Sequence, residues 1–114
     1  MLKQGDIVLV PIPFTDLSAQ KRRPVIVIST DQYNQQNADV VVVAMTSRPF
    51  QTHYGFTITN DQLTEGALNR PGQIRVHKIY TLSQTIIVKK FGRVSIQVLK
   101  RIGSLLQELT TPSP

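Results

Sequence analysis

The chain has 114 residues, 40% of them apolar and 18% charged, which is typical of a globular protein and predicts a single domain over residues 1–114. It contains no cysteine, which excludes a disulfide scaffold, a thiolate zinc site and a cysteine nucleophile. The net charge is +6, and the whole excess lies in residues 62–114, where eight Lys or Arg face two Asp or Glu. This excess indicates a polyanionic partner such as nucleic acid, or a basic surface kept for solubility.

Short runs rich in valine and isoleucine, separated by turn-forming residues, predict six strands. They cover residues 6–12, 24–29, 40–46, 54–59, 73–77 and 85–90. A short helix is also predicted near residues 61–68. The run from Val40 to Met45 is apolar on both strand faces, which predicts a strand covered twice, in a barrel wall or beneath a partner subunit.

The last segment is the one with a clear helical pattern. Apolar residues recur there at intervals of three and four and form one stripe: Val98, Leu99, Ile102, Leu105, Leu106 and Leu109. Ser95 is the expected N-cap, and Gly103 inside the helix predicts a close approach by another element. Together the elements predict a mostly β protein, a small antiparallel barrel with a C-terminal helix.

Several common catalytic patterns are missing from the sequence. It has no His-Glu-x-x-His pair, no glycine-rich phosphate loop and no Gly-x-Ser-x-Gly elbow, and its two histidines are far apart. No apolar run approaches the roughly 18–20 residues of a membrane span. We therefore expect no metal, no cofactor and no membrane partner. The N-terminus lacks a signal-peptide cleavage site, which favours a cytoplasmic location.

Polar and cationic residues at strand ends are the remaining candidates for chemistry. Arg23 precedes Pro24, which holds it extended at the start of a strand, and a guanidinium there can bind phosphate through two hydrogen bonds. Thr46 ends the valine-rich strand and is followed by Ser47 and Arg48. The alternative for Arg23 is a place in a solvated basic loop. The alternative for Thr46, Ser47 and Arg48 is an ordinary polar end of a strand.

A third candidate pair lies on the strand at residues 73–77. Ile74 and Val76 alternate with Gln73, Arg75 and His77, so the polar residues share one face. Arg75 and His77 lie about 7 Å apart along that face and could bind a phosphate and transfer a proton. A polar outer face of the strand is the alternative.

These segments resemble the MazF/PemK family of toxins. The resemblance includes Gly5–Val10, the Arg23-Pro24 motif with the strand after it, the strand ending in Thr46-Ser47, and residues 75–82 and 90–94 before the final helix. It runs from about residue 4 to 109. It implies an SH3-like β-barrel, similar to that of MazF, PemK and CcdB, with a C-terminal helix.

The resemblance also implies a function. Members of the family are endoribonuclease toxins of type II toxin–antitoxin pairs, which cleave single-stranded RNA at short sequences without a metal and leave a 2′,3′-cyclic phosphate and a 5′-hydroxyl. They act as homodimers, and a cognate antitoxin inhibits them. The rival hypothesis is a non-catalytic SH3-like barrel that binds nucleic acid or a protein target such as gyrase.

The family's site residues transfer to particular positions here. Its catalytic arginine falls on Arg23, its catalytic Ser or Thr on Thr46, and the arginine of an Arg-x-Asp pair in the PemK branch on Arg75. The aspartate of that pair is replaced by His77, which becomes the candidate proton-transfer group. The expected RNA-binding residues are Phe14, Lys21, Arg22, Ser47, Arg48 and His53.

Overall fold

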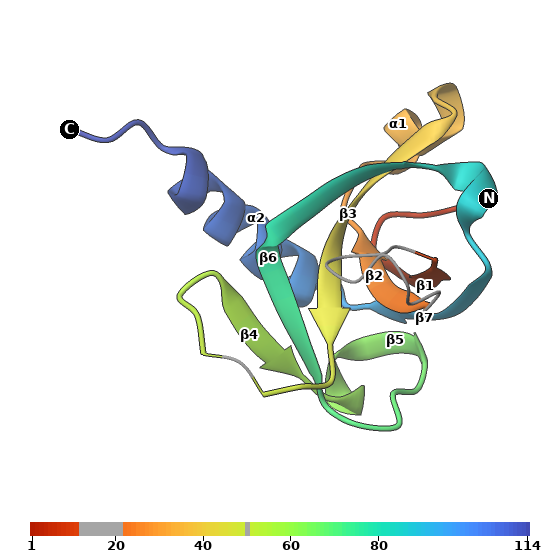
Figure 1. The fold of residues 1–114 in the computed structure, drawn as a ribbon, viewed down its shortest axis with the longest axis horizontal. Coiled ribbons are helices and arrows are strands. Elements are labelled where there is room, and N and C mark those ends of the chain that lie inside the picture. The colour runs from red at the N-terminus through yellow and green to blue at the C-terminus, as the bar shows by residue number, and fades with distance from the viewer. Residues whose placement is uncertain (12–21, 50) are drawn as a thin grey trace.

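The computed structural model describes residues 1–11, 22–49 and 51–114. Within these ranges seven strands form one antiparallel sheet, curled into a half-barrel, in the order β4-β6-β3-β2-β1-β7-β5 (Figure 1). The strands are β1 (Asp6–Val10), β2 (Arg23–Val27), β3 (Asp39–Thr46), β4 (Gly55–Ile58), β5 (Leu63–Gly66), β6 (Gly72–Ser83) and β7 (Lys89–Val94). The predicted fold class, mostly β with a C-terminal helix, is confirmed.

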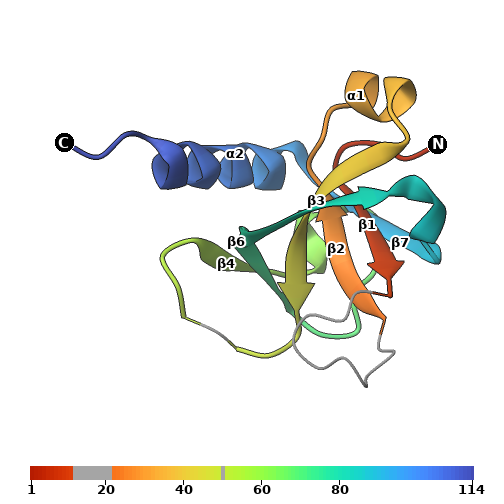
Figure 2. The same ribbon diagram turned by 45° about the horizontal axis from the view of Figure 1, so that its top comes forward.

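The C-terminal helix α2 (Ile96–Thr110) begins where the sequence predicted, since the Ser95 hydroxyl accepts a hydrogen bond from the backbone N–H of Val98. Val98 and Ile102 are buried against the sheet. The C-terminal half of the helix extends past the sheet edge (Figure 2). The expectation of a close approach at Gly103 is wrong, because no atom outside the helix lies within 4 Å of the position that its Cβ would take.

Four other elements differ from the sequence prediction. The strand predicted at 73–77 does not end there but continues to Ser83 as β6. The segment predicted as a helix near 61–68 forms one 3-10 turn, η1 (Asn60–Gln62), and then β5, because Leu63 pairs with Val94 of β7. The strand predicted at 85–90 is replaced by the 3-10 turn η2 (Gln84–Ile86), and β7 starts later, where it pairs with β1. A short helix, α1 (Asp31–Gln36), was not predicted; the Thr30 hydroxyl caps it.

Strand β3 separates two hydrophobic clusters, which explains why its sequence is apolar on both faces. Val43 and Met45 belong to a first cluster, which also packs against α2. Val40 and Val42 belong to a second cluster on the opposite face of the sheet, formed mainly by valines of β1, β2 and β3. Both faces of β3 are thus covered within one chain, and no partner subunit is needed to bury this strand.

Strand β6 is long but bends sharply in its middle. Its first part pairs with the end of β3 through Ala44↔Arg75, and its second part pairs with the same strand through Val43↔Ile79. Three residues, 76–78, therefore form a bulge between neighbouring pairs. The bend lets β6 run along β4 and then cross the top of the sheet (Figure 1).

Candidate active site

A row of polar side chains crosses the sheet at the end of β3. Thr46 pairs with Gln73 of β6, and Gln73 pairs with Thr57 of β4. The register of β2 and β3, continued two residues beyond the pair Val25↔Ala44, places Arg23 opposite Thr46. Directly paired residues share a sheet face, so these four side chains form one row about 14 Å long across four strands.

Arg75 lies in the next row on the same face. It pairs with Ala44, which is two residues before Thr46 and opposite Val25. This face is also the one that carries the second hydrophobic cluster. The Nε atoms of Arg23 and Arg75 are both buried. Two cationic groups thus border a threonine hydroxyl at the polar edge of an apolar surface.

The bulge adds a residue that the sequence did not reveal, Tyr80. It pairs with Val42, so it shares the face of Ala44 and Arg75 although its number has the opposite parity. Tyr80 is half-buried against the second cluster, and burial raises the pKa of its phenol while the positive charge of Arg75 lowers it. Plain alternation from Arg75 would place residue 79 on this face instead. No local sequence signal marks the bulge.

His77 lies inside the bulge and close enough to Arg75 to be affected by its charge. Its Nδ1 atom is buried. Burial, followed by the charges of Arg75 and Lys78, lowers the pKa of the His77 imidazole below its ordinary value, and a hydrogen bond to the backbone of Tyr54 opposes this shift. The neutral imidazole is therefore the favoured form near neutral pH.

The remaining predicted residues divide into three groups. Arg22, Ser47 and Arg48 are exposed and flank the row, and the Arg48 backbone N–H donates to the Thr46 hydroxyl oxygen over 3.2 Å. This bond orients the hydroxyl and leaves its own proton to donate. Phe14 and Lys21 lie outside the described residues.

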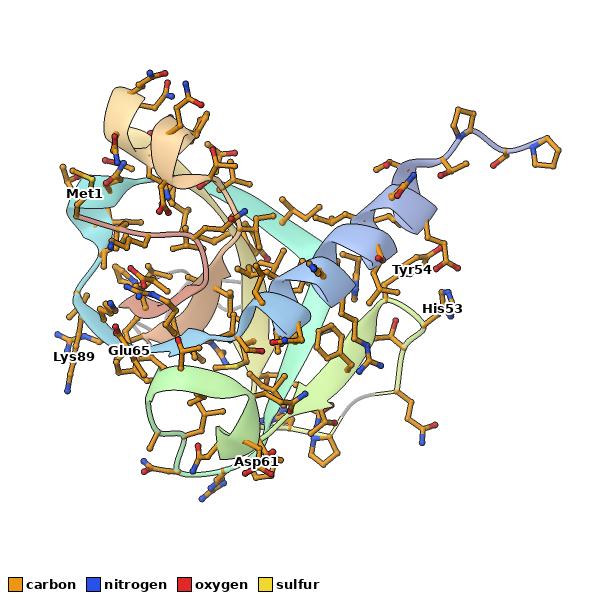
Figure 3. All side chains as sticks on the ribbon, turned by 180° about the vertical axis from the view of Figure 1, so that it is seen from behind. Met1, His53, Tyr54, Asp61, Glu65 and Lys89 are labelled. Atoms are coloured by element: carbon orange, nitrogen blue, oxygen red, sulfur yellow. The ribbon has the colours of Figure 1, made fainter. Side chains whose placement is uncertain are left out.

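His53 is the third group, and it lies near the β4 end of the row, where it lines a surface hollow together with Thr57 and Gln73. It projects from the loop between β3 and β4, beside Tyr54 (Figure 3), and its Nε2 contacts Glu108 of α2 over 2.5 Å. Its side chain is 65% exposed. The structure thus places His53 on the surface, where it connects the loop to the C-terminal helix.

Part of the basic excess serves an internal ion-pair cluster. Asp6 is fully buried, and it accepts a hydrogen bond from Arg93 Nε over 2.9 Å and pairs with Lys90 Nζ over 3.2 Å. The same two cations pair with Glu65. These contacts fasten β1 and β5 to β7, so Lys90 and Arg93 contribute less than their formal charge to attraction of a polyanion.

In the described ranges, no three His, Asp or Glu side chains gather in a way that could hold a metal ion. None of the helices there is long and apolar enough to cross a membrane.

Comparison with solved structures gives close matches of fold at low sequence identity. An endoribonuclease in complex with its cognate antitoxin, from Mycobacterial species, matches with a TM-score of 0.79 and 18% identity over 100% of both chains. A MazE–MazF structure (Form-III) from Deinococcus radiodurans gives 0.77 and 20% over 98% of each. The Mycobacterium tuberculosis toxin MazF-mt6 gives 0.74 and 13% over 96% of this chain and 99% of that one. These likenesses establish the fold.

Comparison with curated protein sequences gives no match. A family model does match, over residues 3–110, and its description is "PemK-like, MazF-like toxin of type II toxin-antitoxin system". That range includes every strand of the sheet described here and the whole of α2. The chain therefore belongs to the PemK/MazF-like toxin family of type II toxin–antitoxin systems.

Proposed function

We propose that the protein is a metal-independent endoribonuclease that cleaves single-stranded RNA and leaves 2′,3′-cyclic phosphate and 5′-hydroxyl ends. The observation that carries the proposal is the arrangement around Thr46, where the register places Arg23 opposite on β2 and where Arg75 occupies the adjacent row on β6. The solved relative described as an endoribonuclease in complex with its cognate antitoxin shares this fold.

RNA supplies its own nucleophile, the 2′-hydroxyl. The enzyme must remove that proton, stabilise the negative charge that develops on the phosphorane, and protonate the departing 5′-oxygen. In the proposal Arg23 stabilises the phosphorane charge, because a guanidinium stays cationic at working pH and can bind two phosphate oxygens at once. Such electrostatic stabilisation supplies about 3–4 kcal/mol.

The other side chains take the remaining tasks. The Thr46 hydroxyl, oriented by the Arg48 N–H, donates a hydrogen bond to the same phosphate. Arg75 holds the backbone and shares in charge stabilisation. His77 removes the proton of the 2′-hydroxyl, for which its lowered pKa suits it, since a base must be neutral before it accepts a proton. The imidazolium formed in this step then gives that proton to the departing 5′-oxygen, which leaves as the 5′-hydroxyl.

The exposed cations Arg22 and Arg48 and the hydroxyl of Ser47 border the polar row, and in the proposal they hold neighbouring phosphates of the strand. We propose Phe14 and Lys21 as further contacts on sequence grounds alone. His53 lines a hollow with Thr57 and Gln73 while its ring contacts Glu108, and in the proposal it contacts RNA at this end of the row.

Two protein partners complete the proposal. Solved relatives include toxins in complex with an antitoxin, and we propose that a cognate antitoxin binds this chain too. We also propose a homodimer. The valine-rich strand does not support a dimer, because both of its faces are covered within the chain. The support is a set of exposed apolar side chains in the described part of the chain: Ile79, Ile86, Val88 and Ile96.

The test is incubation of the purified protein with a long single-stranded RNA in the presence of EDTA, followed by identification of the new ends. The proposal predicts cleavage at a short recurring sequence, with 5′ ends that a kinase labels directly and 3′ ends that resist ligation until the cyclic phosphate is opened. Intact RNA that is retarded in a gel would instead support the non-catalytic binding barrel. Cleavage abolished by EDTA would contradict metal independence.

A further inference from the structure

A cavity of about 300 Å³ lies next to the polar row, at the edge of the sheet where β2 begins and β3 ends. On one side it is lined by Pro24, Met45, Thr46 and Ser47, at the start of β2 and the end of β3. The opposite wall is the segment 67–72, which connects β5 to β6 and runs below the end of β3 in Figure 1. The cavity therefore touches both strand ends that carry the proposed catalytic groups.

The walls of this cavity are held by defined contacts. The backbone N–H of Leu68 donates to Asn60 Oδ1 over 2.7 Å, which fastens the connecting segment to η1. At its other end Gly72 packs so closely on Met45 that a Cβ at this position would lie 2.6 Å from the methionine sulfur. The site is thus preformed, which lowers the entropy cost of ligand binding.

The lining has an apolar interior and a polar rim. Met45 is 5% exposed, and Leu68 and Phe91 are half-buried parts of the first cluster. Ser47, Asn69 and Arg70 are exposed and lie at the rim. A free phosphate would lie against apolar walls with one rim cation to neutralise it, which is unfavourable. A flat apolar ligand with hydrogen-bonding edges matches this distribution.

We propose that this cavity holds one unpaired base of the RNA, belonging to a nucleotide next to the cleaved phosphate, and so helps to set sequence preference. The inference rests on the proposed ribonuclease function. The volume of the cavity, about 300 Å³, is at the lower limit for ligand pockets and suits a single base. Single-stranded RNA is recognised by bases splayed out against side chains and hydrogen-bonded at their edges.

The rim residues indicate how the base is recognised. The Asn69 carboxamide offers both a donor and an acceptor, the Ser47 hydroxyl offers either, and the Arg70 guanidinium offers donors alone. The faces of the base pack against Leu68, Pro24 and Phe91. Thr46 belongs both to the cavity lining and to the polar row. A base in the cavity therefore lies beside the phosphate that Thr46 contacts.

The experiment is an abasic scan in binding. The parent protein first locates its cleavage site on a long RNA, and short RNAs that span this site are then made with a 2′-deoxy nucleotide at the reacting position, so that they bind without being cut. Each position in turn is replaced by an abasic nucleotide. Fluorescence anisotropy gives Kd for the parent, for Asn69→Ala, for Ala67→Phe, which fills the cavity, and for Gln97→Ala, which removes an exposed carboxamide on α2.

For the parent and Gln97→Ala, removal of one base flanking the cleaved bond should weaken binding about tenfold or more. In Ala67→Phe the same removal should change Kd by about twofold or less, since the base is already excluded, and Asn69→Ala should show an intermediate penalty. Circular dichroism melting curves verify that the variants fold.

Equal abasic penalties in the parent and in Ala67→Phe would overturn the inference and leave the ribonuclease proposal intact, because cleavage has already been observed. A variant that changes the binding of a protein inhibitor but not the abasic penalties would assign the cavity to that partner and also overturn it. A parent protein that cleaves no RNA would overturn both.

Discussion

Burial and the positive charge of Arg75 together shift the pKa values of two neighbouring residues. Burial lowers the pKa of the His77 imidazole and raises that of the Tyr80 phenol, while the charge of Arg75 lowers both. For His77 the largest cause is burial, which acts in the same direction as the arginine. Both effects favour the neutral imidazole, so the residue that replaces the aspartate of the PemK branch is suited to act as a base.

The pH dependence of the reaction tests this role for His77. The cleavage rate should be constant at neutral and alkaline pH and fall as pH drops through a pKa below the ordinary histidine value of about 6.5, because protonation removes the base. His77→Ala should lose about 100-fold or more and lose this acidic limb. Initial rates over a series of buffers measure both effects.

His77→Asp restores a base with a lower pKa, so it should keep appreciable activity and move the acidic limb to lower pH. An unchanged pH profile in His77→Ala would show that another group takes the proton. A rate that falls as pH rises through the histidine pKa would mean that His77 acts as an acid instead.

At the scale of elements, strand ends could be predicted from the sequence and strand partners could not. Arg23 and Thr46 could be predicted because one stands directly before a run of apolar residues and the other directly after one. Neighbouring residues in the sequence are enough to show this. β5 was missed because its strand conformation depends on pairing with β7, some 30 residues away. Tyr80 was missed because the bulge in β6 reverses the alternation of faces, and only the pairing with β3 reveals this. The cavity lined by residues 67–72 depends on the same long-range packing.

The bulge makes a prediction for Tyr80, which lies on the face of Arg75. Tyr80→Phe keeps the packing against the second cluster and removes the hydroxyl, so the melting temperature should change little while the cleavage rate falls about tenfold, or about 1.4 kcal/mol in barrier height. Tyr33→Phe in α1 is the matched control and should keep the parent rate. A rate for Tyr80→Phe equal to the parent would remove Tyr80 from the site.

The helix α2 contains a glycine that serves no packing purpose. The Cβ of an alanine at Gly103 would meet open space, and the residue lies inside a regular helix. Gly103→Ala should therefore stabilise the protein by about 0.5–1 kcal/mol, measured by urea unfolding. Gly66→Ala is the contrast, because Gly66 has φ +74° and its Cβ would lie 2.1 Å from the Phe91 carbonyl oxygen; it should destabilise. Loss of stability in Gly103→Ala would show that the glycine has another role.

For the whole molecule, the exposed apolar side chains are the remaining reason to expect a dimer. Ile96 is 61% exposed, Val88 44% and Ile79 42%, while both faces of β3 are covered within the chain. Light scattering at micromolar concentration should give twice the mass of one chain. Ile96→Ser and Val88→Ser should shift the mass toward the monomer if these surfaces form the interface. A monomer mass for the parent across this concentration range would refute the dimer.

If the face with Arg23 cleaves RNA, the cleavage rate of Arg23→Ala in EDTA is the decisive measurement. Lys100→Ala, which removes an exposed cation from α2, is the control for loss of positive charge, and melting curves verify both folds. We expect the parent and Lys100→Ala to cleave RNA at similar rates, and Arg23→Ala to be slower by about 100- to 1,000-fold. A folded Arg23→Ala protein that cuts RNA within a few-fold of the parent rate would contradict cleavage at this face.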